Sequence, residues 1–141
     1  MTKTLALAGL GLMVLLVLGC ESTSSGRGAQ RGMVVADNLV IPDLPVPRGF
    51  KIDNKRSFFN VNPTTNTRVV FVSYTGRGDA LALMGFFREN MAVSGWDLKE
   101  EAGDFGAYVQ KYAKAKEAVE VRIEPGRFKT SFSIALNPKG R

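Results

Sequence analysis

The chain has 141 residues, a formal net charge of +6, one cysteine and no histidine. Without histidine, neither a Ser-His-Asp nor a Cys-His catalytic arrangement can be built, and zinc would lack one of its two commonest ligand types. A lone cysteine also excludes an internal disulfide, so the fold depends on its hydrophobic core.

The first residues have the pattern of a targeting segment. Lys3 supplies a positive start, and the run from Leu5 to Leu18 is apolar and carries no charge. This run is shorter than the roughly 20 residues that span a bilayer. It ends at the small residue Gly19, as a cleaved signal does. We therefore expect residues 1–19 to be a signal peptide.

Cys20 gives this segment a more specific interpretation. The sequence Val17-Leu18-Gly19-Cys20 resembles the bacterial lipobox, whose cysteine is thioether-linked to diacylglycerol before cleavage on its amino side. The resemblance implies a lipoprotein attached to the membrane through acylated Cys20. Glu21, in place of Asp, would direct it to the outer membrane, facing the periplasm. The alternative is an ordinary secretory signal, or an uncleaved anchor, with an incidental cysteine.

Residues 20–41 are expected to form the acylated cysteine and a flexible tether. The stretch from Glu21 to Ala29 is mostly Ser, Thr, Gly and Arg, which cannot bury enough apolar surface to order the chain. A tether of some 15 to 20 residues would hold the domain on the order of 20 to 25 Å from the lipid. A single domain is then expected over residues 42–141.

Prolines mark the start of this domain and predict an extended segment: Pro42, Pro45 and Pro47. Leu44 and Val46 lie between them and are expected to pack along the domain. The alternative is a proline-rich ligand for another protein.

Two strands and one helix are expected next. The first strand lies around Ser57 to Phe59, and the second runs from Thr67 to Tyr74 with apolar residues on both faces, which is typical of a central strand. The helix is expected from Ala80 to Ser94, with Asp79 as its N-cap and Gly95 as its stop. Its apolar stripe indicates packing on a sheet, or alternatively a lipid-binding pocket: Ala80, Leu83, Met84, Phe86, Phe87 and Met91.

The sequence Gly76-Arg77-Gly78-Asp79 invites two other interpretations. It resembles the start of a dinucleotide-binding fingerprint, but Leu81 stands where the third glycine is needed. It also contains the Arg-Gly-Asp tripeptide that integrins read, which is too short to indicate that function. A glycine turn leading into a capped helix explains all four residues.

The distal chain predicts a return strand and hairpins. Strands are expected at Trp96–Glu101, Tyr108–Lys114, Ala118–Glu124 and Lys129–Leu136, from the alternation of apolar and polar residues. Residues 108–117 also fit a helical stripe, so a helix there is the alternative. The fold class is α+β, a mainly antiparallel sheet of about five to six strands packed against one amphipathic helix.

With these elements in place, the chain resembles a loose group of small bacterial envelope lipoproteins of uncharacterised function. The shared features are the lipobox, the Pro-Val-Pro-x-Gly segment at 45–49, and a helix with an aromatic pair and a Met before Gly-Trp. In this chain those helical residues are Phe86, Phe87, Met91, Gly95 and Trp96. The resemblance brings no catalytic residues and no cofactor.

These observations predict a non-catalytic, lipid-anchored envelope protein that acts as a protein-binding or structural module. It would dock another envelope protein through a sheet edge or the Trp96 end of the helix. The alternative is an electrostatic binder of anionic lipid or an acidic envelope polymer, through Arg68, Lys111, Lys114 and Lys116. No metal site and no nucleic-acid partner is expected. A hydrolase built on Asp97 with Glu100 or Asp104 is a distant third possibility.

Overall fold

The computed structural model describes residues 32–104 and 106–139. The expected signal peptide, Cys20 and most of the expected tether lie outside the described residues.

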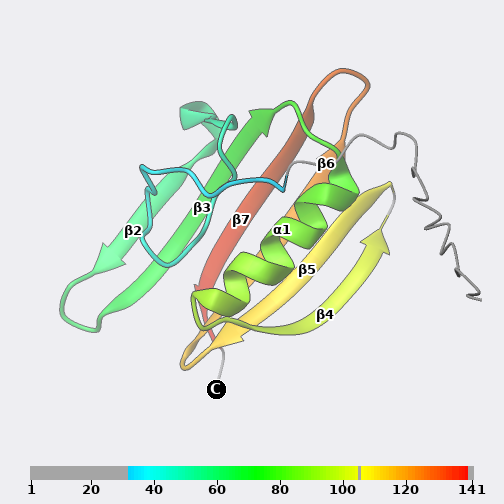
Figure 1. The fold of residues 1–141 in the computed structure, drawn as a ribbon. Coiled ribbons are helices and arrows are strands. Elements are labelled where there is room, and N and C mark those ends of the chain that lie inside the picture. The colour runs from blue at the N-terminus through cyan, green and yellow to red at the C-terminus, as the bar shows by residue number, and fades with distance from the viewer. Residues whose placement is uncertain (1–31, 105, 140–141) are drawn as a thin grey trace, which may run out of the picture. The chain divides into compact units, whose positions relative to one another are not determined.

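One open, antiparallel sheet and one α-helix form the domain (Figure 1), which confirms the α+β class. Within the described residues the sheet has seven strands, one more than the upper expectation, in the order β1-β3-β7-β6-β5-β4, with β2 also paired to β3. The strands are β1 (Lys51–Ile52), β2 (Phe58–Asn62), β3 (Thr67–Gly76), β4 (Asp97–Asp104), β5 (Ala107–Lys114), β6 (Glu117–Pro125) and β7 (Thr130–Pro138).

Strand β1 accounts for the additional strand. It has two residues, too few to show an alternating pattern, and pairs with Thr75 and Tyr74 at one end of β3. A 3-10 turn, η1 (Asn54–Arg56), follows it, and β2 then continues along the same side of β3. Strand β3 is therefore an interior strand, as its two apolar faces predicted.

Helix α1 (Ala80–Val93) begins and ends as the sequence predicted. The Asp79 carboxylate accepts a hydrogen bond from the Ala82 amide at 2.9 Å, satisfying one of the free N–H groups of the first turn. At the other end, Gly95 adopts a φ of 81°. The amide of Trp96 then reaches the carbonyl of Met91 at 2.9 Å, the 6→1 bond of a Schellman motif.

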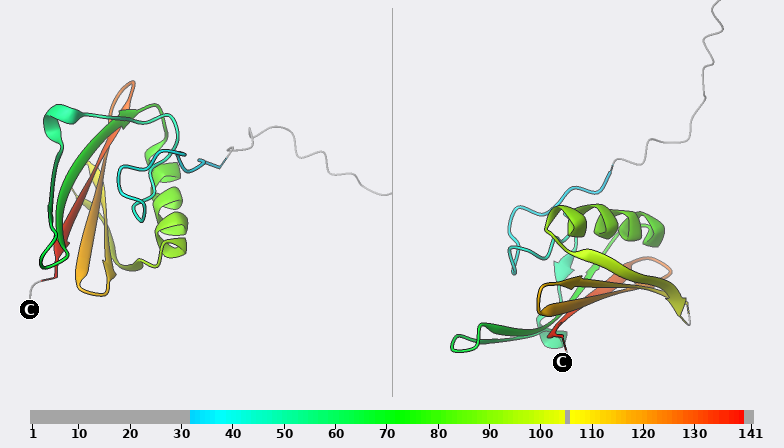
Figure 2. Two further views of the ribbon diagram at one scale, coloured as in Figure 1. Left: turned by 90° about the vertical axis from the view of Figure 1, so that its left-hand side faces the viewer. Right: turned by 90° about the horizontal axis from the view of Figure 1, so that it is seen from below.

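The residues before β1 cover the part of the sheet that the helix leaves open. A helix is about 10–12 Å wide, whereas strands lie about 4.8 Å apart, so α1 cannot cover the whole sheet. It contacts β4, β5 and β6. Residues 33–50, which we call the strap, lie beside the helix on the same face (Figures 1 and 2). Ile41, Leu44 and Val46 of the strap are buried.

The strap begins before residue 42, where the domain was expected to start. Val35 forms a β-bridge with Pro47, and the Ala36 amide donates to the Val46 carbonyl at 2.8 Å. The strap therefore folds back on itself before it crosses the sheet. Burial of Leu44 and Val46 confirms that they pack along the domain.

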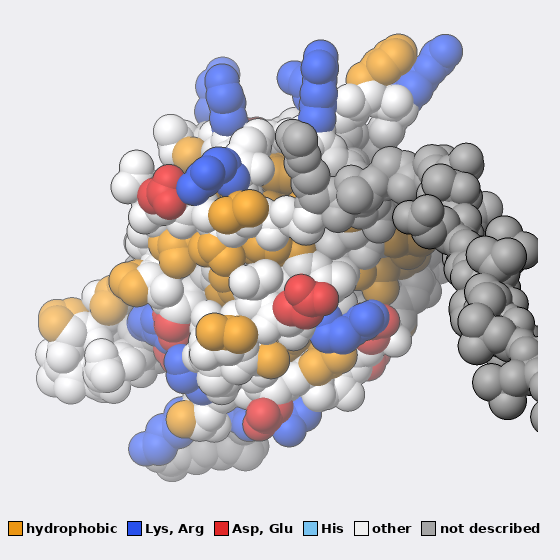
Figure 3. Space-filling model, in the orientation of Figure 1, with side chains coloured by type: hydrophobic (Ala, Val, Ile, Leu, Met, Phe, Trp, Pro, Cys, Tyr) orange, Lys and Arg blue, Asp and Glu red, His pale blue; other side chains and the backbone are white. Residues whose placement is uncertain are grey.

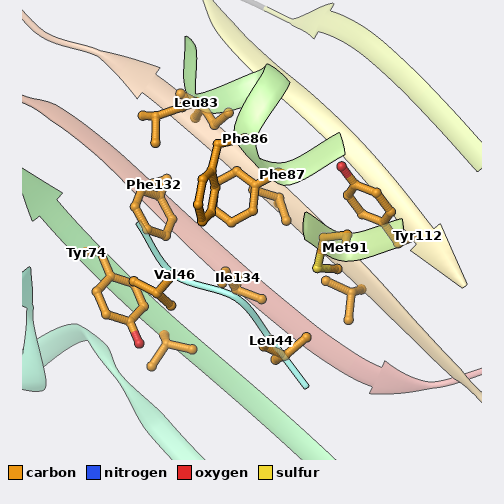
Figure 4. Close-up of a cluster of buried hydrophobic side chains, with 14 of the residues drawn as sticks. Leu44, Val46, Tyr74, Leu83, Phe86, Phe87, Met91, Tyr112, Phe132 and Ile134 are labelled. Carbon is orange, nitrogen blue, oxygen red and sulfur yellow. The ribbon is translucent and has the colours of Figure 1, made fainter. Parts of the chain in front are cut away.

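An aromatic cluster joins the helix, the sheet and the strap at the centre of the core (Figure 4). The Phe132 ring lies 5.0 Å from Tyr74 and 5.1 Å from Phe87, centroid to centroid, and Phe86 lies 5.3 Å from Phe87. The whole apolar stripe of α1 is buried against this core, as expected for packing on a sheet: Ala80, Leu83, Met84, Phe86, Phe87 and Met91.

The glycines that precede α1 have a steric role. A Cβ on Gly76 would lie 2.6 Å from Cδ1 of Phe50, and one on Gly78 would lie 3.0 Å from the same ring. The Phe50 ring itself packs 5.2 Å from Phe132. These glycines therefore make room for a core side chain, which explains the motif without a nucleotide.

Candidate functional site

Arg68, the first residue expected to bind anions, is already held by two carboxylates. Its guanidinium donates to Asp43 of the strap, with Nη1 2.7 Å from Oδ1, and its Nε lies 2.8 Å from Oε1 of Glu117 on β6. Nη2 donates to the other oxygen of each carboxylate. All three side chains are 20–26% exposed. Arg68 therefore ties the strap to two strands.

Lys114 and Trp96 complete this group, which we call the Asp43 latch: Asp43, Arg68, Trp96, Lys114 and Glu117. The Lys114 ammonium lies 3.3 Å from Oδ2 of Asp43 and 5.4 Å from the centroid of Trp96. It also donates to the carbonyl of Ser94 at 2.8 Å, at the end of α1. The Trp96 indole N–H donates to the Asp43 carbonyl at 2.8 Å.

The latch is electrically balanced, because its two cations face two carboxylates. Hydrogen bonding to Arg68 lowers the pKa of Asp43 below its ordinary value of 3.8, although partial burial opposes the shift. Hydrogen bonds from the guanidinium to Glu117 and Asp43 raise the pKa of Arg68. Such a group fastens segments together and has no excess charge to offer an anion.

The structure brings only some of the expected surface residues together. Arg68, Lys114 and Trp96 meet in the latch, and Lys116 lines a nearby hollow of about 440 Å³ that also touches Arg68. Lys111 lies on the opposite face of β5 and binds Glu100 at 2.8 Å. Trp96 is 1% exposed, so its ring contacts the strap rather than solvent.

A second polar group lies under α1 and is fully hydrogen-bonded. Gln110 on β5 is completely buried, and its Nε2 donates to the Met84 carbonyl at 3.1 Å and to Glu101 at 2.6 Å. The Tyr112 hydroxyl donates to Oε1 of Gln110 at 3.0 Å, and Arg88 binds Glu101 at 2.7 Å. These contacts position the helix over β4 and β5.

The pKa shifts in this second group keep its charges fixed. Hydrogen bonds from Arg88, and then from Gln110, lower the pKa of Glu101 below 4.5. Burial raises the pKa of Tyr112 above its ordinary value. Glu101 therefore stays ionised and Tyr112 stays protonated near neutral pH.

The carboxylates considered for hydrolysis have separate partners. Asp97 lies 3.6 Å from Lys99 and is 78% exposed, while Glu100 binds Lys111. The side chain of Asp104 lies outside the described part of the chain. Among the described residues, no cluster of three or more Asp, Glu, His or Cys side chains is arranged to hold a metal.

The two edges of the sheet differ in how they are protected. Strand β4 carries charged residues and has a register shift between Leu98 and Glu100. Charges and bulges both discourage pairing with another strand. Strand β2 is uncharged, is exposed along its whole length, and pairs only with β3. Its apolar side chains Phe58, Phe59 and Val61 are 46–56% exposed.

This edge was missed at the level of sequence, although a signal existed. The run Phe58-Phe59-Asn60-Val61-Asn62 is uncharged and apolar on both faces, next to a turn. That pattern also fits a central strand, so only the observed pairing shows that β2 is an edge.

Comparison with known proteins gave no match to a family model, a curated protein or a solved structure. A search of the described residues for a helix long and apolar enough to cross a membrane also found none.

Proposed function

We propose that this protein is a lipid-anchored, non-catalytic module of the bacterial envelope that docks a partner protein along the free edge of β2. The observation that carries the docking proposal is the contrast between the two edges. Strand β4 is charged and bulged, whereas β2 presents an uncharged row of exposed apolar residues.

The partner chemistry follows from this edge. An exposed edge strand offers unpaired N–H and C=O groups, and an extended segment of another protein can add to it by β-augmentation. Phe58 stacks on Phe71 with ring centroids 6.4 Å apart, so one face of the edge is already aromatic. Phe59 and Val61 project from the other face. An extended, apolar segment would meet side chains on both faces.

The anchor is tested by metabolic labelling with a fatty-acid analogue. We expect the native chain to incorporate the label and Cys20→Ala to lose it, because thioether formation requires the thiol. Cys20→Ser is a matched control that keeps the size and polarity of the side chain, and it should also be unlabelled. Label retained in both variants would refute attachment at Cys20.

Docking is tested by site-specific crosslinking in intact cells, with a photoreactive residue placed at Phe59. We expect a discrete adduct with another envelope protein, identified by mass spectrometry. The matched control is the same residue at Leu81, which is exposed at 63% but lies on α1. Val61→Pro should reduce the Phe59 adduct, since it disrupts the edge. Equal adducts at Phe59 and Leu81 would contradict docking at β2.

A further inference from the structure

The cations of the domain divide into paired and unpaired groups. Arg48, Arg68, Arg88, Lys99, Lys111 and Lys114 each bind a carboxylate. Arg56 and Arg122 also face carboxylates. Within the described chain, seven cations have no ion pair. Two of them, Lys116 and Lys139, line the hollow beside Arg68. We call the other five the basic end: Lys51, Lys55, Arg77, Arg127 and Lys129.

The basic end is continuous in space although it is dispersed in sequence. Lys51, Lys55 and Lys129 line one hollow of about 450 Å³. Lys51 and Lys129 line a second hollow of about 210 Å³ together with Arg77. The one carboxylate in these linings, Asp53, caps η1 by accepting from the Lys55 amide and also faces Arg56. Positive charge therefore predominates here.

An exposed aromatic residue accompanies this charge. Phe128 lies in the loop between β6 and β7, flanked by Arg127 and Lys129, and is 80% exposed. The Arg127 guanidinium lies 5.2 Å from the ring centroid. Figure 3 shows Lys and Arg side chains projecting from the upper margin of the molecule, where Figure 1 places this hairpin. Cations around an exposed aromatic are typical of surfaces that enter the headgroup region of a bilayer.

The direction of the anchor supplies an independent argument. The described chain starts at the basic end, because the Met33 methyl lies 3.0 Å from the position that a Cβ would take on Gly78, next to Arg77. The stretch from Cys20 to Gly32 reaches at most about 45 Å even when fully extended. The ten residues of β3 span about 33 Å. The basic end is therefore the part of the described domain that the chain from Cys20 reaches first, and a stretch of this length allows it to contact the lipid.

We propose that the basic end is a membrane-docking face that binds anionic lipid headgroups, with Phe128 inserted between them. The inference rests on the proposed anchoring through Cys20. It differs from the surface expected from the sequence, where Arg68 and Lys114 are paired within the latch and Lys111 is paired with Glu100. Docking would fix the orientation of the anchored domain and leave the edge of β2 accessible to a partner.

The test uses the full chain, purified with its anchor and reconstituted into vesicles of brominated phosphatidylcholine, alone or mixed equally with phosphatidylglycerol. Phe128→Trp introduces a fluorophore at the hairpin, and the native chain, with buried Trp96, is the blank. Val93→Trp is the matched control, because Val93 is 87% exposed at the far end of α1. We expect bromine to quench the Phe128→Trp signal in phosphatidylglycerol vesicles at low salt, and far less at high salt.

Removing the charge tests the same docking face. Each Lys or Arg near an anionic membrane surface favours the docked state about fivefold. The triple change Lys51→Gln, Arg77→Gln and Lys129→Gln should therefore lower the ratio of docked to undocked domain about 100-fold. Lys99→Gln with Lys111→Gln, which removes cations on β4 and β5, should leave the quenching unchanged. No effect of the triple change would overturn the proposal.

The remaining outcomes separate docking from anchoring. A labelled, anchored chain with equal quenching at Phe128→Trp and Val93→Trp would overturn the docking face and leave the anchor intact. A chain that takes up no fatty-acid label would refute the anchor, whatever the quenching. The Cys20→Ala chain can also be bound to an alginate column and to phosphatidylglycerol vesicles, and released from each with salt. If alginate retains it at a salt concentration that releases it from the vesicles, the basic end binds an acidic polymer and the lipid proposal is overturned.

Discussion

Asp43 shows how a single residue connects distant parts of this chain. Its carboxylate binds Arg68, 25 residues away, and Lys114, 71 residues away, while its carbonyl accepts from the indole of Trp96. Because the pairs are partly buried, salt and water screen their attraction less than that of exposed pairs. The attraction between the ions offsets part of the free energy that their desolvation costs. Losing one member therefore leaves its partners without compensation.

We predict that Arg68→Met lowers the free energy of unfolding by about 1–3 kcal/mol, between the values typical of exposed and fully buried pairs. The physical reason is that Glu117 would lose the guanidinium that binds it, and Asp43 would keep only the longer contact with Lys114. Urea denaturation followed by Trp96 fluorescence measures the change. Lys99→Met, which removes a cation from an exposed pair, should change stability by less than about 0.5 kcal/mol.

A double variant tests whether the residues of the latch are energetically coupled. In the double variant Arg68→Met with Glu117→Gln, part of the lost stability should return, since the carboxylate that Arg68 had balanced is gone. If the two changes add without coupling, the latch does not act as a unit.

At the scale of elements, local chemistry made some predictions possible. Asp79 and Gly95 define the ends of α1 through contacts within the helix and its immediate neighbours, so a short stretch of sequence contains the whole signal. Residues 108–117 fitted a helix as well as the expected strand. Pairing of β5 with both β4 and β6 decides for a strand, and that information lies outside the segment.

The candidate sites were harder to predict, because they depend on residues far apart in sequence. In the sequence, nothing distinguishes Arg68 from an unpaired cation, because its partner Glu117 lies 49 residues away. Conversely, Lys51 and Lys129 belong to separate, unremarkable stretches and meet only because β1 and β7 are both neighbours of β3. Sequence patterns record periodicity within an element, whereas charge balance depends on topology.

At the scale of the whole molecule, stability is expected to depend on pH mainly in the acid range. The folded protein lowers the pKa of Asp43 and of Glu101, so it binds fewer protons than the unfolded chain. Stability from these groups is present above their ordinary pKa values, 3.8 and 4.5, and is lost as the pH falls through the lower values of the folded state. With no histidine in the chain, no side chain has its ordinary pKa near neutrality.

We predict that the free energy of unfolding, measured with urea, is nearly level from about pH 7 to pH 5 and declines below about pH 4.5. Asp43→Asn should make the decline shallower, because one group with a lowered pKa is gone. Asp97→Asn is the control, since that carboxylate is 78% exposed and its pair with Lys99 is long. An identical decline in native protein and Asp43→Asn would show that the latch does not contribute to acid sensitivity.

The position of β7 also sets the order in which the molecule can be completed. This last strand lies in the middle of the sheet, between β3 and β6, and places Ile134 beside Val72. The strap precedes every strand of the sheet in the described chain, yet the core that it joins includes Phe132 and Ile134 of β7. A growing chain can therefore form α1 and the β4–β6 hairpins early, but it cannot close its core until its final strand is available. A chain that lacks residues 130–138 is left with two separate groups of strands, β1–β3 and β4–β6, because β7 is the strand that joins them.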